Sequence, residues 1–290
     1  MNRLQNQIRK LKNPSMIYFS WDPEQIPKPY LAAKQGPLSA YCAYAKDLIV
    51  ALKGVVPALR FGFGSFALLG AEGLNALDEL LRFARKQEFY LLLDMPEIWS
   101  VRQAELYADS LMQKGSIWEL DGLLLSCYMG SDTLKLFGDR VKTADKDLFI
   151  SVRTANKSAS EIQDLLTGSR LVWTAAADTA KRLGESTITR CGYSRVGIVG
   201  PGTSADTLAA MRNKYPSVFV LIDGFDYPGA NAKNCASAFD NLGHGAVACT
   251  GSYILSAWKN TDLYDPNPVE LAVQAAERMK KNLNRYVTIL

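Results

Sequence analysis

Short apolar runs alternate with longer amphipathic stretches along the whole chain. Eight runs are rich in Val, Ile, Leu and Phe and are mostly apolar on both faces: 15–21, 58–63, 89–95, 120–126, 147–153, 195–200, 217–224 and 245–250. Such runs are typical of buried parallel strands, because a strand with one wet face alternates apolar and polar residues. The pattern therefore predicts eight strands in a buried parallel sheet.

The amphipathic stretches between these runs predict helices. Their ranges are 38–53, 71–87, 101–115, 131–143, 158–184, 204–214, 231–239 and 252–258. At the stretch 204–214, the segment ADTLAAMRNKY (205–215) opens after Thr203 and Ser204, which are both candidate N-caps. The stretch 71–87 carries an apolar face opposite its charges, made of Leu74, Leu77, Leu80, Leu81 and Phe83.

Eight strand–helix repeats predict an α/β fold, a (β/α)8 TIM barrel, as a single domain. An open doubly wound sheet is the main alternative. No GxGxxG or GxxxxGK[ST] motif stands at a strand–helix turn, which weakens a nucleotide-binding form of that sheet. We expect the barrel to occupy residues 1–259, with residues 260–290 forming a C-terminal loop and helix packed on it.

The composition is that of an ordinary globular protein, with 48% hydrophobic and 21% charged residues among 290. A net charge of +4, with dispersed Lys and Arg, argues against a nucleic-acid partner. The N-terminal residues are polar and basic, unlike a signal peptide. No apolar run reaches the ~20 residues that span a bilayer. We therefore expect a cytoplasmic protein without a membrane partner.

Cysteine and histidine content limits the possible chemistry. The single His244 excludes histidine-rich metal sites, which need two or three imidazoles. It also excludes a serine hydrolase triad unless His244 is the base, and its position at a strand start favours a structural role. We expect no metal and no cofactor. Reduced thiols without a CxxC pair are expected at Cys42, Cys127, Cys191, Cys235 and Cys249.

The C-terminal ends of the strands carry the candidate functional residues, because a (β/α)8 barrel places its chemistry there. Structural roles remain open for several of them: Asp22 could start a turn, Arg60 could pair with Asp94, and Thr154 with Asn156 could form a turn or cap. As an acidic pocket the set would suit a sugar, an amine or a magnesium-bridged ligand. The pocket candidates are Asp22, Arg60, Asp94, Glu97, Tyr128, Thr154, Asn156, Thr203, Asp223 and Asp226.

A phosphate site on this fold commonly uses the loops after the seventh and eighth strands. After the eighth strand, residues 250–253 (TGSY) could offer backbone N–H groups to an anion. The preceding loop brings Asp223 and Asp226. Two carboxylates oppose the binding of a phosphate unless a cation intervenes.

Five segments carry a family resemblance in the right order and at the right spacing. They are residues 2–23 (NRLQNQIRKLKNPSMIYFSWDP), 55–74 (VVPALRFGFGSFALLGAEGL), 151–165 (SVRTANKSASEIQDL), 196–208 (VGIVGPGTSADTL) and 245–259 (GAVACTGSYILSAWK). In these segments the chain resembles orotidine 5'-phosphate decarboxylases of the longer bacterial branch. The resemblance covers about residues 1–259 and implies the barrel fold.

The same resemblance implies that catalytic residues are replaced. The family reads Asp-x-Lys-x-x-Asp after its third strand, whereas this chain reads DMPEIW over residues 94–99. Asp94 keeps the first carboxylate, and Pro96 stands at the position of the catalytic lysine. Trp99 stands at the position of an aspartate that the family supplies across its dimer interface. Arg60 replaces the upstream lysine of the charge network.

The ligand contacts implied by the resemblance are also altered. Ser252 stands at the position of the phosphate-binding arginine after the last strand, beside Gly251, and Pro228 at that of a glutamine in the seventh loop. These three form a degenerate phosphate site. Asp22 matches the ribose-contacting aspartate, and Thr154 lies in the pyrimidine-contacting segment.

The replacement of the lysine bears directly on the reaction. Decarboxylation leaves a carbanion that an ammonium group must stabilise and protonate; proline has no such group, and the Arg60 guanidinium is too weak an acid, with a pKa above about 12. We therefore expect a pseudoenzyme that acts through protein contacts, as a homo- or heterodimer through the barrel mouth, with itself or with an active decarboxylase. The alternatives are a different small-molecule ligand and residual decarboxylation of orotidine 5'-phosphate to UMP in pyrimidine biosynthesis.

Overall fold

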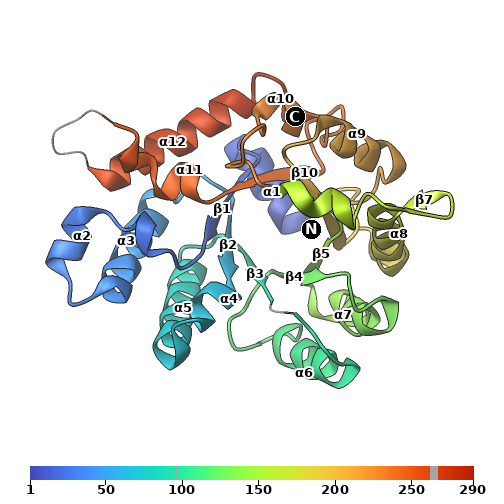
Figure 1. Cartoon of the computed structure of the whole chain (residues 1–290), viewed down its shortest axis with the longest axis horizontal. Helices are drawn as coiled ribbons and strands as arrows, with labels where there is room; N and C mark the ends of the chain where they lie inside the picture. Colours follow the sequence, from blue (N-terminus) through green and yellow to red (C-terminus); the bar gives the residue numbers. More distant parts are fainter. Residues whose placement is uncertain (96, 262–266) are drawn as a thin grey trace.

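A closed barrel of eight parallel strands forms the centre of the molecule (Figure 1). The structure, a computed structural model, describes residues 1–95, 97–261 and 267–290. Neighbouring strands follow the chain order, and β1 closes the barrel by pairing with both β2 and β10. The (β/α)8 prediction is confirmed, and the open doubly wound sheet is ruled out. The barrel strands are β1 (Ser15–Phe19), β2 (Ala58–Gly62), β3 (Tyr90–Asp94), β4 (Gly122–Ser126), β5 (Asp147–Ser151), β8 (Val196–Pro201), β9 (Val220–Asp223) and β10 (Ala246–Thr250).

Helices surround the barrel on all sides (Figure 1). Ser204 caps α9 by accepting a hydrogen bond from the backbone N–H of Thr207 at 3.2 Å, as the sequence predicts. In the helix predicted over 71–87, Leu77 is buried as expected, but Leu74 is exposed and was wrongly assigned to the apolar face. The long helices are α3 (Pro37–Ala51), α5 (Gly70–Lys86), α6 (Val101–Leu111), α7 (Ser131–Ala144), α8 (Val172–Gly184), α9 (Ala205–Lys214) and α12 (Pro268–Leu283); the shorter ones are α2 (Lys28–Ala33), α4 (Phe63–Ala67), α10 (Ala232–Ala236) and α11 (Ser252–Leu255).

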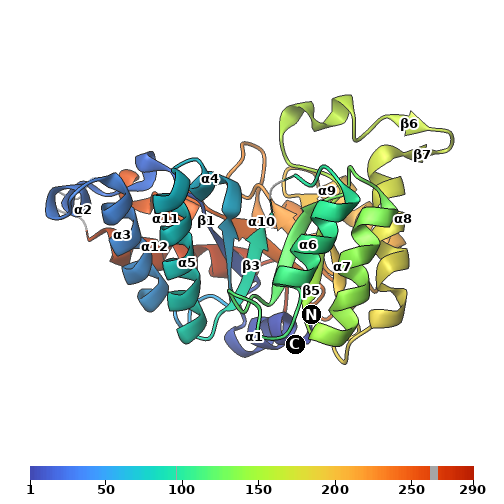
Figure 2. The ribbon, with the colours of Figure 1, turned by 90° about the horizontal axis from the view of Figure 1, so that it is seen from below.

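The single helix predicted over 158–184 is wrong. A 3-10 turn, η2 (Lys157–Glu161), leads into an antiparallel hairpin of β6 (Leu166–Thr167) and β7 (Arg170–Leu171), and only then does α8 begin. Gly168 turns the hairpin with a φ of 64°, a conformation that glycine adopts without strain. The hairpin stands out from the barrel as an arm (Figure 2).

The N-terminal ends of the strands are closed by helix α1 (Asn2–Leu11), which lies beneath the barrel beside both chain ends (Figure 2). Leu4 and Ile8 are fully buried, and the Gln5 side chain accepts a hydrogen bond from the backbone N–H of Gly245 at 3.0 Å. At the same end, the His244 ring nitrogen Nε2 lies 2.9 Å from the Leu290 carbonyl oxygen, a structural contact far from the strand ends that carry chemistry.

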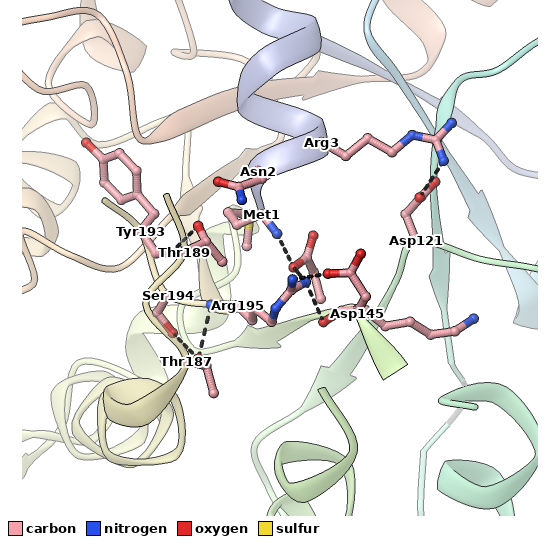
Figure 3. Close-up of polar contacts among 12 residues, drawn as sticks. Met1, Asn2, Arg3, Asp121, Asp145, Thr187, Thr189, Tyr193, Ser194 and Arg195 are labelled. Carbon is pink, nitrogen blue, oxygen red and sulfur yellow. Dashed lines mark hydrogen bonds and ion pairs between the residues drawn. The ribbon is translucent and has the colours of Figure 1, made fainter. Parts of the chain in front are cut away.

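Ion pairs fix this closed end (Figure 3). The Met1 amine pairs with the buried carboxylate of Asp147, which also lies 3.3 Å from an Arg195 guanidinium nitrogen. Arg195 pairs in turn with Asp145, and Arg3 pairs with Asp121 at 2.9 Å. These contacts tie α1 to the lower end, and in this fold the chemistry lies at the opposite, open end of the barrel.

The C-terminal helix packs onto the barrel's outer helices. Helix α12 contacts α3, α10 and α11, and its buried face includes Ala272, Ala276 and Met279. All five cysteines are free thiols, and Cys42, Cys235 and Cys249 are buried. Among the described residues, none of the helices combines the length and the hydrophobicity that a membrane span requires.

Candidate functional site at the barrel mouth

Arg60 holds the centre of the mouth, which is the open end of the barrel where the C-terminal ends of the strands converge. Its Nε and Nη2 atoms each donate to one carboxylate oxygen of Asp94 at 2.7 Å, and Nη1 donates to Asp223 at 2.8 Å. Arg60 comes from β2, Asp94 from β3 and Asp223 from β9, so barrel closure brings them together. The N–H donors of the guanidinium are thus bound to two carboxylates of the chain itself. The ion pair between Arg60 and Asp94, one of the alternatives from the sequence, is confirmed.

This cluster is buried and carries an excess of negative charge. The Arg60 side chain is only 9% exposed. Burial lowers the pKa of Arg60, but the charges of Asp94 and Asp223 outweigh it and hold that pKa well above its ordinary value. By formal charge the two carboxylates outnumber the guanidinium, and burial raises the pKa of Asp94. Arg60 is therefore a fixed cation and cannot supply a proton.

Two side chains within the strands complete the cluster, and the sequence did not indicate them. The Arg60 guanidinium carbon lies 4.5 Å from the centre of the Tyr18 ring, on β1, in a cation–π contact. The Cys249 sulfur, on β10, lies 3.7 Å from Arg60 Nη1, and burial raises the pKa of this thiol to about 12. The thiol is therefore protonated at neutral pH and unreactive as a nucleophile. The sequence signal that could have indicated Tyr18 and Cys249 was their inward position in otherwise apolar strands.

Asp226 forms a second cluster at the end of β10. Its Oδ2 accepts hydrogen bonds from the backbone N–H of Gly251 at 2.8 Å and from the Ser252 hydroxyl at 3.0 Å. Its Oδ1 accepts from the Thr250 hydroxyl. The backbone N–H and hydroxyl groups that the sequence suggested for an external anion thus bind a carboxylate of the chain.

Three more of the pocket candidates have local contacts. Asp22 caps the short helix η1 (Pro23–Gln25) by accepting from the backbone N–H of Glu24 at 2.9 Å. The Thr154 hydroxyl donates to the Asn156 side-chain oxygen at 2.6 Å, and the Thr154 backbone N–H donates to Gln163 at 2.8 Å. These are the turn and cap contacts that the sequence left open as alternatives.

The remaining candidates lie at the edge of the mouth. Glu97 and Pro228 are exposed, and Thr203 is half-buried after β8. Tyr128 is 83% exposed and Trp99 is 77% exposed. Pro96, where the resemblance expects the catalytic lysine, lies outside the described residues. The ten pocket candidates therefore separate into the Arg60 cluster, the Asp226 cluster, two turns and scattered rim positions.

Comparison with known proteins places this geometry in a family. No family model matches the chain. It is 27% identical over 263 residues to an orotidine 5'-phosphate decarboxylase of Rhodopirellula baltica, covering 87% of each protein, and 26% identical over 286 residues to one of Clostridium novyi, covering 98% of each. It is 30% identical over 198 residues to the orotidine 5'-phosphate decarboxylase of Clostridium kluyveri, covering 68% of this chain and 67% of that protein. The chain belongs to the orotidine 5'-phosphate decarboxylase family.

Solved structures of the same family share the fold along the whole chain. An orotidine 5'-monophosphate decarboxylase of Plasmodium berghei superposes with a TM-score of 0.79 at 14% identity, covering 98% of each chain. An OMP decarboxylase of Leishmania donovani gives a TM-score of 0.72 at 23% identity, covering 97% of each chain. The expected family fold is thus present from end to end.

The decarboxylase-family mouth of this chain offers limited chemistry. Within residues 1–95, 97–261 and 267–290, no group of three or more His, Cys, Asp or Glu side chains is arranged to hold a metal ion. The cation in the Arg60 cluster is a guanidinium rather than an amine. Such a cluster can orient and stabilise charge, but its guanidinium does not release a proton.

Proposed function

We propose that the chain is a non-catalytic member of the decarboxylase family that acts by pairing with a second copy of itself through the rim of its mouth. The observation that supports this most directly is the Arg60 cluster, in which the cation of the mouth is a guanidinium bound to Asp94 and Asp223. Decarboxylation needs a donor that can protonate a carbanion, and a guanidinium does not give up its proton in proteins. The sequence carries proline at position 96, where the family has its lysine.

Charge in the mouth also opposes the family's substrate. Orotidine 5'-phosphate carries a carboxylate and a phosphate group. The Arg60 cluster holds two carboxylates against one guanidinium, and Asp226 fills the turn after β10. Preorganised charge usually contributes more to catalysis than any other single effect, so a mouth of the wrong sign loses that contribution.

We expect no decarboxylation of orotidine 5'-phosphate above the background of a matched variant, Asp94→Asn. Enzymes accelerate their reactions by roughly a millionfold or more, so release of CO2 measured over days distinguishes a catalytic chain from a non-catalytic one. Equal rates for the natural chain and Asp94→Asn support a non-catalytic mouth. A natural chain that turns over faster than Asp94→Asn contradicts it.

The apolar rim supports the second part of the proposal. We give this name to five exposed side chains on the segments that follow three consecutive barrel strands, β3, β4 and β5. Monomeric proteins rarely leave several large apolar side chains exposed in one region, and such regions commonly bind other proteins. The members of the apolar rim are Trp99 (77% exposed), Tyr128 (83%), Ile162 (63%), Leu165 (54%) and Leu166 (73%).

A second copy is the partner that fits this rim best. The resemblance assigns to the position of Trp99 an aspartate that the family supplies across its dimer interface. A dimer with two-fold symmetry brings the same patch of both subunits together, so apolar side chains on one rim meet apolar side chains on the other. Exchanging that aspartate for an exposed indole makes the contact apolar and removes a charged group from the mouth.

We expect the full chain to dimerise in sedimentation experiments, and Trp99→Asp to weaken the dimer by about thirtyfold or more, as the loss of a central aromatic contact does. Tyr286→Asp is the matched control, because Tyr286 is 55% exposed near the closed end of the barrel. A chain that stays monomeric at all concentrations, or a dimer that Trp99→Asp leaves intact, contradicts the proposal. A chain that pairs only with an intact decarboxylase also contradicts self-pairing and identifies the other partner.

A further inference from the structure

The turn after β10 is a complete binding site for one anion. It points three hydrogen-bond donors at a single carboxylate: the Thr250 hydroxyl, the Gly251 N–H at 2.8 Å and the Ser252 hydroxyl at 3.0 Å. Gly251 has no side chain to keep an anion away; a Cβ there would lie 3.2 Å from the Tyr18 carbonyl oxygen and 3.7 Å from Asp226 Oδ2. Donors gathered in this way bind carboxylates and phosphates alike.

The loop that carries Asp226 is shaped to bring the carboxylate to these donors. Gly224 has a φ of 75°, and the Tyr227 N–H donates to its carbonyl oxygen at 3.0 Å, which closes a tight turn around Asp226. A second turn follows, in which the Ala230 N–H donates to the Tyr227 carbonyl oxygen at 3.0 Å. The backbone therefore fixes the direction of the side chain.

Solvent reaches this site through a neighbouring cavity of about 590 Å³. Asp226 and Ser252 line it, together with the exposed Lys259. A small anion could therefore reach the donors if the carboxylate were removed. The position also fits the fold, because the loops after the seventh and eighth barrel strands commonly bind phosphate.

We propose that Asp226 supplies from within the chain the anion that a phosphorylated ligand would bring to this turn, and that it thereby excludes phosphorylated ligands from the mouth. A phosphate group meets both a steric block and a like charge at these donors. Asp226 is thus a specificity-determining residue, and ligands of the natural mouth are not phosphate monoesters. The inference deepens the proposed function, in which Asp226 already opposes orotidine 5'-phosphate, by extending the exclusion to phosphate monoesters in general; it uses none of the residues of the apolar rim.

The test measures inorganic phosphate binding to the full chain by 31P NMR and calorimetry. Asp226→Ala frees three donors and removes one charge, so we expect it to bind phosphate at least about tenfold more tightly than the natural chain. Asp226→Asn keeps the side-chain shape and should bind phosphate with intermediate affinity. This variant provides the test if Asp226→Ala does not fold. Glu97→Gln is the matched control: it removes one exposed carboxylate at the mouth, leaves the donors occupied, and should bind like the natural chain.

Location is tested by a second substitution. Adding Ser252→Ala to Asp226→Ala should weaken phosphate binding again, since it removes one donor. A natural chain that binds phosphate as tightly as Asp226→Ala overturns the proposal. So do folded Asp226→Ala and Asp226→Asn chains that gain no affinity, or a Ser252→Ala change without effect. These outcomes are read from phosphate binding, whereas the proposed function is read from turnover and dimerisation, so either can fail alone.

Discussion

Replacing Arg60 with methionine should lower the free energy of unfolding by about 3–5 kcal/mol, the usual effect of removing one partner from a buried ion pair. Methionine fills similar volume, so the loss reports charge rather than packing. Without the guanidinium, Asp94 and Asp223 face each other across the mouth with no cation between them. Urea denaturation followed by tryptophan fluorescence measures the change.

Three further variants separate charge from shape in this prediction. Arg60→Lys keeps the charge but loses the bidentate fork, so it should cost less than Arg60→Met. Adding Asp223→Asn to Arg60→Met should recover part of the loss, because it removes one of the two unpaired carboxylates. Arg102→Met, at a side chain that is 70% exposed, should change stability little. An Arg60→Met chain as stable as Arg102→Met would show that the cluster contributes nothing to the fold.

The barrel was predictable from sequence because its strands are buried on both faces. Val196–Pro201 is buried at every position and forms a continuous apolar run; Ala58–Gly62 is also buried throughout, with Arg60 as its one charged residue. Their ends were less predictable: the run predicted over 217–224 forms a strand only from Val220 to Asp223. Strand ends depend on pairing with the neighbouring strands, which a single sequence does not display.

The helical segment around the arm was predicted wrongly for a physical reason. Residues 158–184 keep an amphipathic spacing, and the turn at Gly168 interrupts it with only one glycine. The Arg153 side chain pairs with Asp164 at 2.9 Å and so holds the segment before the arm against the end of β5. A single sequence does not display this ion pair, and three of the five members of the apolar rim lie in the segment that it borders.

The mouth could be predicted in part. The sequence indicated Arg60, Asp94 and Asp223 together because all three were expected at strand ends. The pairing of Arg60 with Asp223, however, depends on barrel closure between strands far apart in the chain. The same holds for Asp226, which the sequence indicated as a pocket candidate and as a charge opposing phosphate. Its contact with Gly251 requires both the turn around Asp226 and the turn after β10.

Arg212 is a second buried cation that the sequence did not single out, and its loss should also be severe. From α9 it donates only to backbone carbonyl oxygens: Nε to Ala238 at 2.8 Å, Nη2 to Gly245 at 2.6 Å, and Nη1 to three carbonyls of the segment before β9, those of Tyr215, Pro216 and Val218. The guanidinium also lies 5.4 Å from the centre of the Tyr193 ring. One side chain thus joins α9 to the loops before β9 and β10.

Arg212→Met should lower the free energy of unfolding by about 3 kcal/mol or more, because buried carbonyl groups left without donors cost about 1–3 kcal/mol each. Arg212→Lys should cost less, since an ammonium group can reach some of the same oxygens but lacks the planar fork. Lys214→Met is the matched control on the same helix, at a side chain that is 44% exposed. Urea denaturation ranks the three variants. Equal stability of Arg212→Met and Lys214→Met would mean that water replaces the guanidinium at these carbonyls, and that the loops before β9 and β10 do not depend on Arg212.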